Sequence, residues 1–268
     1  MSETGFSPTI GVFDSGLGGL TALRQLRALA PGCDIVYFGD TGRVPYGTRD
    51  AETLVRFARQ DVEFLRSQGA QQVLVACGTI SSALSADQWA ALPLPCQGVI
   101  EAAVAAALAA TQNGRIGILA TPASIRSGSY VRRLAALRPE VLAVPVACPD
   151  FVPLIESGRA DAPQMRLAAR EYLRPILEAG CDTLILGCTH YPLAAPLLTE
   201  ETGGRMRLID SGKEAAAALL RQLPAVPAER SGSLRCFVSG DPAAFAQNAR
   251  TLLGDSLVLP AVRQAQAF

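Results

Sequence analysis

The sequence lacks an excess of either charge, and it lacks a long apolar run. Lysine and arginine together number 24, as do aspartate and glutamate, so the formal net charge is zero. This balance predicts no broad electrostatic surface for nucleic acid or for an anionic membrane. The longest apolar stretch, around Ala102–Ala110, is well short of the roughly 20 residues that cross a bilayer. We therefore expect a small-molecule partner, with no nucleic acid and no membrane.

Signals for export, metal binding and cofactor attachment are also missing. The N-terminal segment lacks the basic region and apolar run of a secretory signal. The seven cysteines, at positions 33, 77, 96, 148, 181, 188 and 236, form an odd count without a Cys-x-x-Cys pair, which argues against a disulfide framework and a metal site. Lys213 is the only lysine, outside any pyridoxal motif, so no electron-sink cofactor is indicated. We expect a cytoplasmic protein with reduced thiols, no metal and no cofactor.

Short apolar runs that end in Gly, Asp, Thr or Cys alternate with Ala- and Leu-rich segments of helical spacing. This alternation is typical of a parallel α/β sheet. The predicted strands are Thr9–Phe13, Asp34–Phe38, Gln72–Ala76, Arg115–Leu119, Val141–Pro145, Thr183–Leu186, Arg207–Ile209 and Arg235–Ser239. The predicted helices include Gly19–Leu29, Ala51–Gln68, Glu101–Thr111, Ala162–Ala179 and Lys213–Gln222.

A faint internal repeat relates two halves of the chain. The run Ile10–Gly16 resembles Ile116–Pro122, and Val73–Cys77 resembles Leu184–Cys188 at nearly the same offset. Any two parallel strands have similar apolar runs, but this repeat also pairs two cysteines. It favours two related lobes that place two equivalent strand ends, each with a cysteine, across one cleft.

Cys77 and Cys188 both follow predicted strands, where the next helix is expected to begin. Ligands of open α/β sheets bind beyond these carboxyl ends. A helix N-terminus lowers the pKa of a thiol and makes thiolate available as a base. The alternative is that a free cysteine is a small buried apolar residue, which we accept for the other five.

His190, the only histidine, lies two residues beyond Cys188. Its imidazole can exchange protons with that thiol or donate a hydrogen bond to a substrate carboxylate. A structural histidine is one alternative. A Cys-His protease dyad is another, and it would leave Cys77 unexplained.

The segment Phe13–Gly19 (FDSGLGG) follows the first strand and opens a helix. It matches a dinucleotide fingerprint only in part, because Thr21 stands where glycine or alanine is required and Asp14 would face the pyrophosphate. We favour backbone N–H groups that bind a substrate carboxylate, with Asp14 pairing with an ammonium group.

Two other segments have open interpretations. The polar loop Asp40–Gly47 (DTGRVPYG), with its path constrained by proline and glycine, either lines the cleft or is an ordinary surface loop. Glu156 is either a cleft carboxylate or a solvated helix position. The residues alone do not choose between these alternatives.

Taken together, these motifs resemble the glutamate racemase family, in the aspartate/glutamate racemase superfamily, over essentially the full length. The segments that carry the resemblance are Asp14–Gly19 (DSGLGG), Pro45–Gly47 (PYG), Val75–Cys77 (VAC) and Gly187–Pro192 (GCTHYP), with Thr121 and Glu156 in further similar segments. The Thr-His after the second cysteine is similar to the glutamate branch, whereas Thr-Glu is typical of the aspartate branch.

The resemblance implies an α/β fold of two pseudo-symmetric lobes, each a mostly parallel sheet flanked by helices, with the active site in the cleft between them. It implies a first lobe of residues 1–98 plus 210–268, a second lobe of residues 99–209, and a homodimer. The expected activity is cofactor-independent racemisation of L-glutamate to D-glutamate, which supplies peptidoglycan precursor synthesis.

The resemblance also implies the site residues. One cysteine as thiolate removes the Cα proton, and the other as thiol returns a proton to the opposite face. The expected catalytic residues are Cys77, Cys188, His190 and Asp14. The expected substrate-binding residues are Asp14, Ser15, Pro45, Tyr46, Gly47, Gly78, Thr79, Thr121, Glu156, Thr189 and His190.

One position departs from the family pattern. The family normally has Cys-Asn-Thr at the first cysteine, whereas this sequence has Cys77-Gly78-Thr79. The missing amide removes hydrogen bonds worth about 0.5–1.5 kcal/mol each. Two alternatives follow: a racemase for aspartate or another small amino acid, and a non-catalytic binding or regulatory relative.

Overall fold

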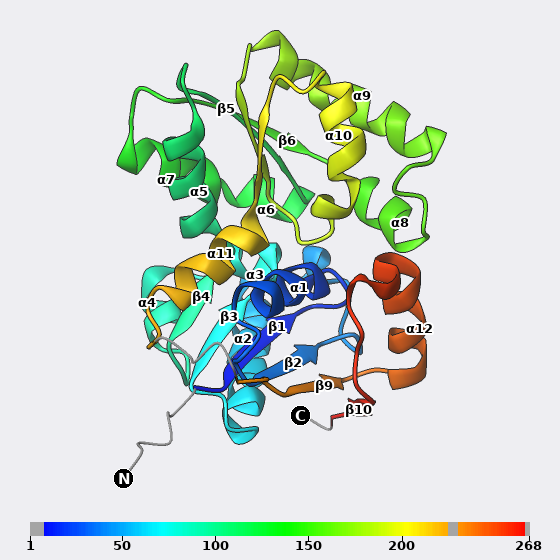
Figure 1. Ribbon diagram of the computed structural model, residues 1–268. Helices are drawn as coiled ribbons and strands as arrows, with labels where there is room; N and C mark the ends of the chain where they lie inside the picture. Colours follow the sequence, from blue (N-terminus) through cyan, green and yellow to red (C-terminus); the bar gives the residue numbers. More distant parts are fainter. Residues whose placement is uncertain (1–7, 225–229, 266–268) are drawn as a thin grey trace.

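The chain folds around two parallel β-sheets (Figure 1). The computed structural model describes residues 8–224 and 230–265. The strands of the first sheet are β1 (Ile10–Asp14), β2 (Ile35–Gly39), β3 (Gln72–Val75), β4 (Cys96–Gly98), β9 (Leu234–Val238) and β10 (Val262–Gln264). Those of the second are β5 (Arg115–Ala120), β6 (Leu142–Ala147), β7 (Thr183–Leu186) and β8 (Arg207–Asp210). The six-stranded order is β10-β9-β2-β1-β3-β4, and the four-stranded order is β6-β5-β7-β8.

Helices connect the strands and cover the faces of both sheets (Figure 1). The α-helices are α1 (Gly19–Leu29), α2 (Ala51–Ser67), α3 (Gly78–Ala83), α4 (Ala86–Ala90), α5 (Val99–Ala110), α6 (Pro122–Ser127), α7 (Ser129–Leu137), α8 (Phe151–Glu156), α9 (Pro163–Glu178), α10 (Ala195–Glu201), α11 (Ser211–Leu220) and α12 (Pro242–Leu253). The 3-10 helices are η1 (Tyr46–Thr48), η2 (Tyr191–Ala194) and η3 (Gly254–Ser256). No helix among the described residues is both long and apolar enough to cross a membrane.

All eight predicted strands are present within two residues of their expected bounds, and so are the five named helices. Strands β4 and β10 were not predicted from the sequence. Each is a three-residue edge strand, too short to show a hydrophobic period.

The two sheets share one arrangement of four strands. The order β2-β1-β3-β4 in the first corresponds to β6-β5-β7-β8 in the second. The hydrogen bonds at the strand ends also correspond, since Ala76 N donates to Phe13 O at 2.9 Å and Gly187 N donates to Leu119 O at 2.7 Å. The prediction of two pseudo-symmetric lobes is confirmed, and β9 and β10 extend only the first sheet.

A shared apolar core joins the two lobes. Residues of β1 and β5, such as Val12 and Ile118, belong to one buried cluster with Leu20 of α1, Val104 of α5 and Ala215 of α11. Helix α11 follows β8 of the second sheet but packs on α1 and α5 (Figure 1). The strands change sheet after β4 and again after β8, and the exact lobe boundaries stay a prediction.

Candidate active site

A cavity of about 700 Å³ opens between the carboxyl ends of the two sheets. Its first-lobe wall consists of residues 14–17, 41, 44–48 and 77–79, and its second-lobe wall consists of residues 121–123, 126, 148, 149, 152, 156 and 187–190; Asn248 of α12 also lines it. Every residue named above as catalytic or substrate-binding lines this cavity. The structure thus brings the predicted residues together, while their individual roles stay predictions.

The loop that contains Thr41 lines the cavity, as one of its two interpretations predicted, but several other lining residues were not expected from the sequence. Arg126 and Asn248 line the cavity, but α6 and α12, which carry them, have no motif that marks them. Cys148, which was expected to be only a buried apolar residue, also reaches the wall, although it is 1% exposed. The strand ends of the cleft were therefore predictable from the sequence, and the helix residues that close it were not.

Cys77 is the N-cap residue of α3, where the first-lobe repeat ends. Its thiol is buried and donates a weak hydrogen bond to Ser15 Oγ, with 3.6 Å between the two atoms. Burial, reinforced by the charge of Asp14, raises the pKa of Cys77 to about 12. The first turn of α3 acts in the expected direction, since the Ile80 N–H lowers the pKa, but burial outweighs it and the net shift is upward, contrary to the prediction.

Cys188 does not begin an α-helix, contrary to the prediction. It lies in a turn that leads into η2, and α10 starts only at Ala195. An α-helix starting at Cys188 would need the residue 192 N–H to bond the Cys188 carbonyl, and Pro192 has no N–H. Instead Tyr191 N donates to Cys188 O at 3.1 Å, which closes a tighter turn.

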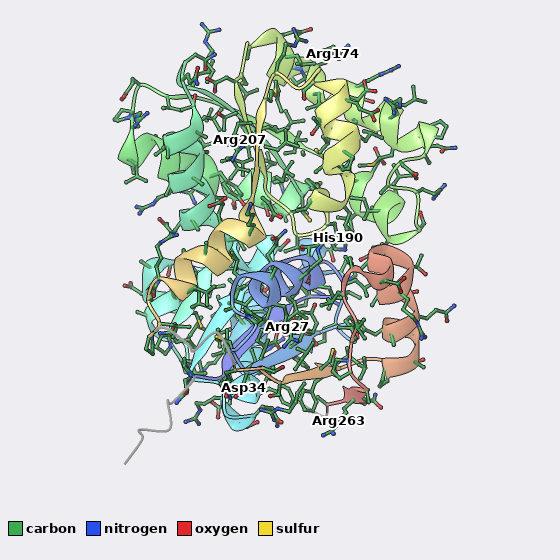
Figure 2. All side chains as sticks on the ribbon, viewed as in Figure 1. Arg27, Asp34, Arg174, His190, Arg207 and Arg263 are labelled. Atoms are coloured by element: carbon green, nitrogen blue, oxygen red, sulfur yellow. The ribbon has the colours of Figure 1, made fainter. Side chains whose placement is uncertain are left out.

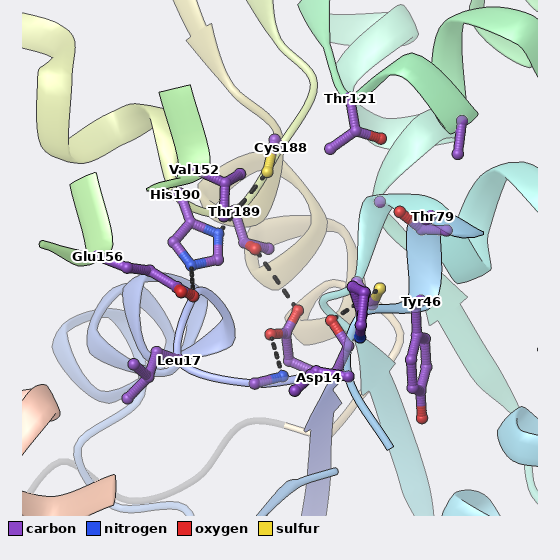
Figure 3. A pocket seen from close by; sticks show the side chains of 18 of the residues that line it. Asp14, Leu17, Tyr46, Thr79, Thr121, Val152, Glu156, Cys188, Thr189 and His190 are labelled. Carbon is purple, nitrogen blue, oxygen red and sulfur yellow. Dashed lines mark hydrogen bonds and ion pairs between the residues drawn. The ribbon is translucent and has the colours of Figure 1, made fainter. Parts of the chain in front are cut away.

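His190 links Cys188 to Glu156 (Figure 3). Its Nδ1 lies 3.7 Å from Cys188 Sγ, and its Nε2 lies 2.9 Å from Glu156 Oε1. Burial alone would lower the pKa of His190, but the hydrogen bonds to Cys188 and Glu156 raise it to about 10. A protonated imidazole can donate to both partners at once. Glu156 is thus a cleft carboxylate, and its side chain is 42% exposed.

Asp14 lies at the end of β1 and faces the second lobe (Figure 3). Its carboxylate accepts from Gly16 N at 2.9 Å and from Thr189 Oγ1 at 3.5 Å. Burial raises the pKa of Asp14, and the charge of His190 acts in the opposite direction. A cationic group stabilises a buried carboxylate of this kind, and a ligand bound in the cavity can supply such a group.

The first-lobe glycines allow the lobes to meet closely. A Cβ at Gly18 would lie 2.2 Å from Thr189 Oγ1 and 2.5 Å from His190 Nδ1, so only glycine fits there. Thr21 Oγ1 also donates to Thr189 O at 2.7 Å. Figure 2 shows His190 at this junction between the two lobes. Gly18 therefore serves contact between the lobes, which the sequence analysis did not anticipate.

The remaining predicted residues offer hydroxyl and backbone groups on facing walls (Figure 3). Thr121 caps α6, accepting from Ser124 N at 3.3 Å, and Thr79 lies in the first turn of α3 across the cavity. Tyr46 lines the cavity, and its hydroxyl contacts Asp40 and Asp61. Within residues 8–224 and 230–265, no group of His, Cys, Asp and Glu side chains is suited to hold a metal ion.

Comparisons with known proteins agree with this arrangement. A family model described as Asp/Glu/Hydantoin racemase matches residues 21–219. The glutamate racemase of Geobacter metallireducens is 42% identical over 252 residues, which are 92% of this chain and 93% of that protein.

Solved structures give the same result. A glutamate racemase isoform from Bacillus anthracis matches with a TM-score of 0.87 at 32% identity, and 96% of each chain is covered. The glutamate racemase of Francisella tularensis, solved in complex with D-glutamate, matches with a TM-score of 0.85 at 31% identity, over 97% of this chain and 98% of that one. The chain therefore belongs to the Asp/Glu/Hydantoin racemase family and lies among its glutamate racemases.

Proposed function

We propose that this protein interconverts L- and D-glutamate without a cofactor, and that Cys77 and Cys188 are its acid/base pair. One observation carries the proposal. The two cysteines leave corresponding strands of two pseudo-symmetric sheets at corresponding points, and both line the same cavity. Inversion at Cα needs two proton-transfer groups on opposite faces of one carbon, and the repeat supplies such a pair.

The proton balance of the reaction assigns a role to each sulfur. When Cys188 is the base, its thiolate takes the Cα proton, and the thiol of Cys77 gives its proton to the opposite face. The products are the inverted amino acid, a Cys188 thiol and a Cys77 thiolate, so atoms and charge balance. The reverse direction exchanges the two roles.

The surroundings of each sulfur support this division. Burial, reinforced by Asp14, raises the pKa of Cys77 to about 12, so Cys77 holds its proton until a substrate arrives. The substrate ammonium group then pairs with Asp14 and brings positive charge toward Cys77, which favours its thiolate. On the other wall, His190 Nδ1 lies 3.7 Å from Cys188 Sγ, where the imidazole can exchange a proton with that sulfur.

The other lining groups bind the substrate in this proposal. Ser15, Thr79 and Thr189 supply hydroxyl groups, and the first turn of α3 supplies N–H groups, to hold the α-carboxylate as negative charge develops at Cα. The relative from Francisella tularensis was solved with D-glutamate, which supports glutamate as the substrate. We also propose a cytoplasmic homodimer that supplies D-glutamate for peptidoglycan precursors.

Solvent deuterium tests the two-base scheme. In deuterated water, early product should carry deuterium at Cα while the remaining substrate stays unlabelled.

Substitution of each cysteine tests the assignment of the two bases. Cys77→Ser and Cys188→Ser should each lower kcat by about 10²- to 10⁴-fold, whereas Cys96→Ser, outside the cavity, serves as the matched control. Equal early labelling of substrate and product, or full activity in either cavity variant, would contradict the proposal.

A panel of L- and D-amino acids, followed by circular dichroism, tests the substrate. Glutamate should react fastest. A preference for aspartate would instead favour a role for Gly78 in substrate choice, and tight binding without turnover would favour a non-catalytic relative.

A further inference from the structure

The loop between β2 and α2 forms one wall of the cavity, and a buried polar cluster lies beneath it. The cluster consists of Asp40, Arg43, Tyr46, Asp61 and Ser239, and we call it the Asp40–Asp61 cluster. Asp40 follows β2, Arg43 and Tyr46 belong to the loop, Asp61 comes from α2, and Ser239 follows β9. The side chains of both aspartates are fully buried, at 0% exposed.

Asp40 has the surroundings of an ionised carboxylate. Arg43 Nε donates to its Oδ2 at 2.5 Å, Ser239 Oγ donates to its Oδ1 at 2.7 Å, and the Tyr46 hydroxyl also donates to Oδ2. Hydrogen-bond donors from three different side chains converge on this one group. Such convergence stabilises negative charge in a buried place.

Asp61 has different surroundings. Arg43 donates from its second terminal nitrogen to Asp61 Oδ1 at 2.5 Å. The other oxygen, Oδ2, lies 3.1 Å from Tyr46 Oη. A tyrosine hydroxyl has only one hydrogen, and the hydrogen bond that Tyr46 donates to Asp40 uses it. The contact between Asp61 Oδ2 and Tyr46 Oη is therefore a hydrogen bond only if Asp61 is protonated and donates it.

Electrostatics point in the same direction. Two ionised carboxylates that share one guanidinium, away from water, repel each other and lose their hydration. Burial and the nearby charge of Asp40 raise the pKa of Asp61 well above its usual range, and the charge of Arg43 only partly opposes this.

We propose that Asp61 is a neutral carboxylic acid, and that a hydrogen-bond chain from Asp61 through Tyr46 to ionised Asp40 holds the loop Thr41–Thr48 in position as a wall of the cavity. The rings of Tyr46 and of Phe57 in α2 lie 5.4 Å apart between centroids, tilted by 44°, and the Arg43 guanidinium lies over the Phe57 ring at 4.0 Å from its centroid. Asp61 touches no part of the cavity. It is a positioning residue, and only its kinetic effect rests on the proposed function.

The same chemical change at the two aspartates separates their roles. Asp61→Asn keeps an oxygen that accepts from Arg43 and an N–H that donates to Tyr46, so it should fold normally and keep kcat and KM within about threefold. Asp40→Asn puts an NH₂ group against converging donors, so it should release the loop. Because misplacement by about 1 Å costs on the order of 10²-fold, we expect kcat/KM of Asp40→Asn to fall by about 10- to 100-fold. Equal damage from the two substitutions would show that Asp61 is ionised and would overturn the proposal.

An infrared measurement on the unmodified protein tests the proton itself. With isotope-labelled aspartate, the full chain at neutral pH should show the C=O stretch of a protonated carboxylic acid, and Asp61→Asn should abolish that band. Absence of the band in the unmodified chain would overturn the proposal even if either variant failed to fold. If the band is present but no racemase activity is found, the proposed function fails and the assignment of the proton stands.

Discussion

The two walls of the cleft each contribute one cysteine, yet the two sulfurs have different neighbours. Cys77 faces Ser15 and lies close enough to Asp14 for that charge to act on its pKa. Cys188 faces His190, which in turn bonds Glu156. The repeated strands place the sulfurs in corresponding positions, whereas the side chains around them are not repeated. Pseudo-symmetry thus determines where the pair lies, and the local residues determine how each member holds its proton.

This difference gives the two walls different routes to solvent. The Glu156 side chain is 42% exposed, so protons can pass between Cys188, His190 and bulk water. Cys77 is 4% exposed, and its side-chain hydrogen-bond partner is Ser15, which is not titratable at neutral pH. We expect Cys188 to exchange its proton with solvent faster than Cys77 does.

A double-mutant experiment gives the largest expected effect and tests this comparison directly. In Cys77→Ser only Cys188 remains, and in Cys188→Ser only Cys77 remains. Each variant should exchange the Cα hydrogen of one enantiomer without inverting it, and the two variants should act on opposite enantiomers. Adding His190→Asn to Cys77→Ser should slow the remaining exchange by about 100-fold, while adding it to Cys188→Ser should change the exchange by only a few-fold. Nuclear magnetic resonance of the Cα signal measures both rates, and equal slowing in the two backgrounds would refute the assignment of His190 to Cys188.

The assignment of His190 to Cys188 also predicts the effect of His190→Asn when both cysteines are present. The equilibrium constant of a racemisation is one, so kcat/KM must be equal in the two directions. His190→Asn alone must therefore lower kcat/KM equally from L- and D-glutamate, even though it acts on one wall. Separate kcat and KM values are free to differ, which makes the one-sided exchange the sharper measurement.

A smaller effect is expected in stability against pH. The pKa of His190 is raised from 6.5 to about 10 in the folded protein. Its contribution to the free energy of unfolding is therefore fully present below pH 6.5 and is lost as the pH rises through about 10. Glu156→Gln removes one cause of the raised pKa of His190. The decline in the free energy of unfolding between pH 6.5 and about 10 should therefore become shallower. The change should be at most about 1 kcal/mol, because Glu156 is partly exposed to solvent. Urea unfolding across the window measures this, with Glu178→Gln, an exposed α9 position outside the cavity, as the control. Parallel profiles for the protein and Glu156→Gln would contradict the role of Glu156.

The sequence predicted the cysteine pair because strands and repeats leave local patterns. Val73–Cys77 and Leu184–Cys188 are apolar runs that end in the same residue type, and in the structure they form the ends of β3 and β7, with each cysteine two residues beyond its strand. It also predicted the family, which the comparisons confirm. These features depend on residues close together in the chain.

Contacts between distant segments could not be predicted in this way. Glu156 and His190 are far apart in sequence, and their 2.9 Å contact depends on how α8 packs beside η2. The hydrogen bonds between Asp61 and the loop residues Arg43 and Tyr46 likewise depend on α2 crossing under the loop. Cys188 shows a local error, since the sequence analysis expected a helix there without allowing for the missing N–H of Pro192.

The glycines beside the two cysteines include the position with the smallest expected effect, Gly78. A Cβ at Gly78 would lie 2.8 Å from the carbonyl oxygen of Gly187, on the opposite wall. A Cβ at Gly187 would instead lie 2.9 Å from Leu119 O, within its own lobe. Gly78→Ala can relieve its clash by a slight separation of the lobes, so kcat/KM should fall by only a few-fold with little change in Tm. Gly187→Ala must distort a packed strand end, which costs about 1–3 kcal/mol, so its Tm should fall. Thermal unfolding and kinetics of the two variants measure this. A larger loss of Tm in Gly78→Ala than in Gly187→Ala would mean that the contact between the lobes is as rigid as the packing within each sheet, and that the cleft cannot adjust its width at Cys77.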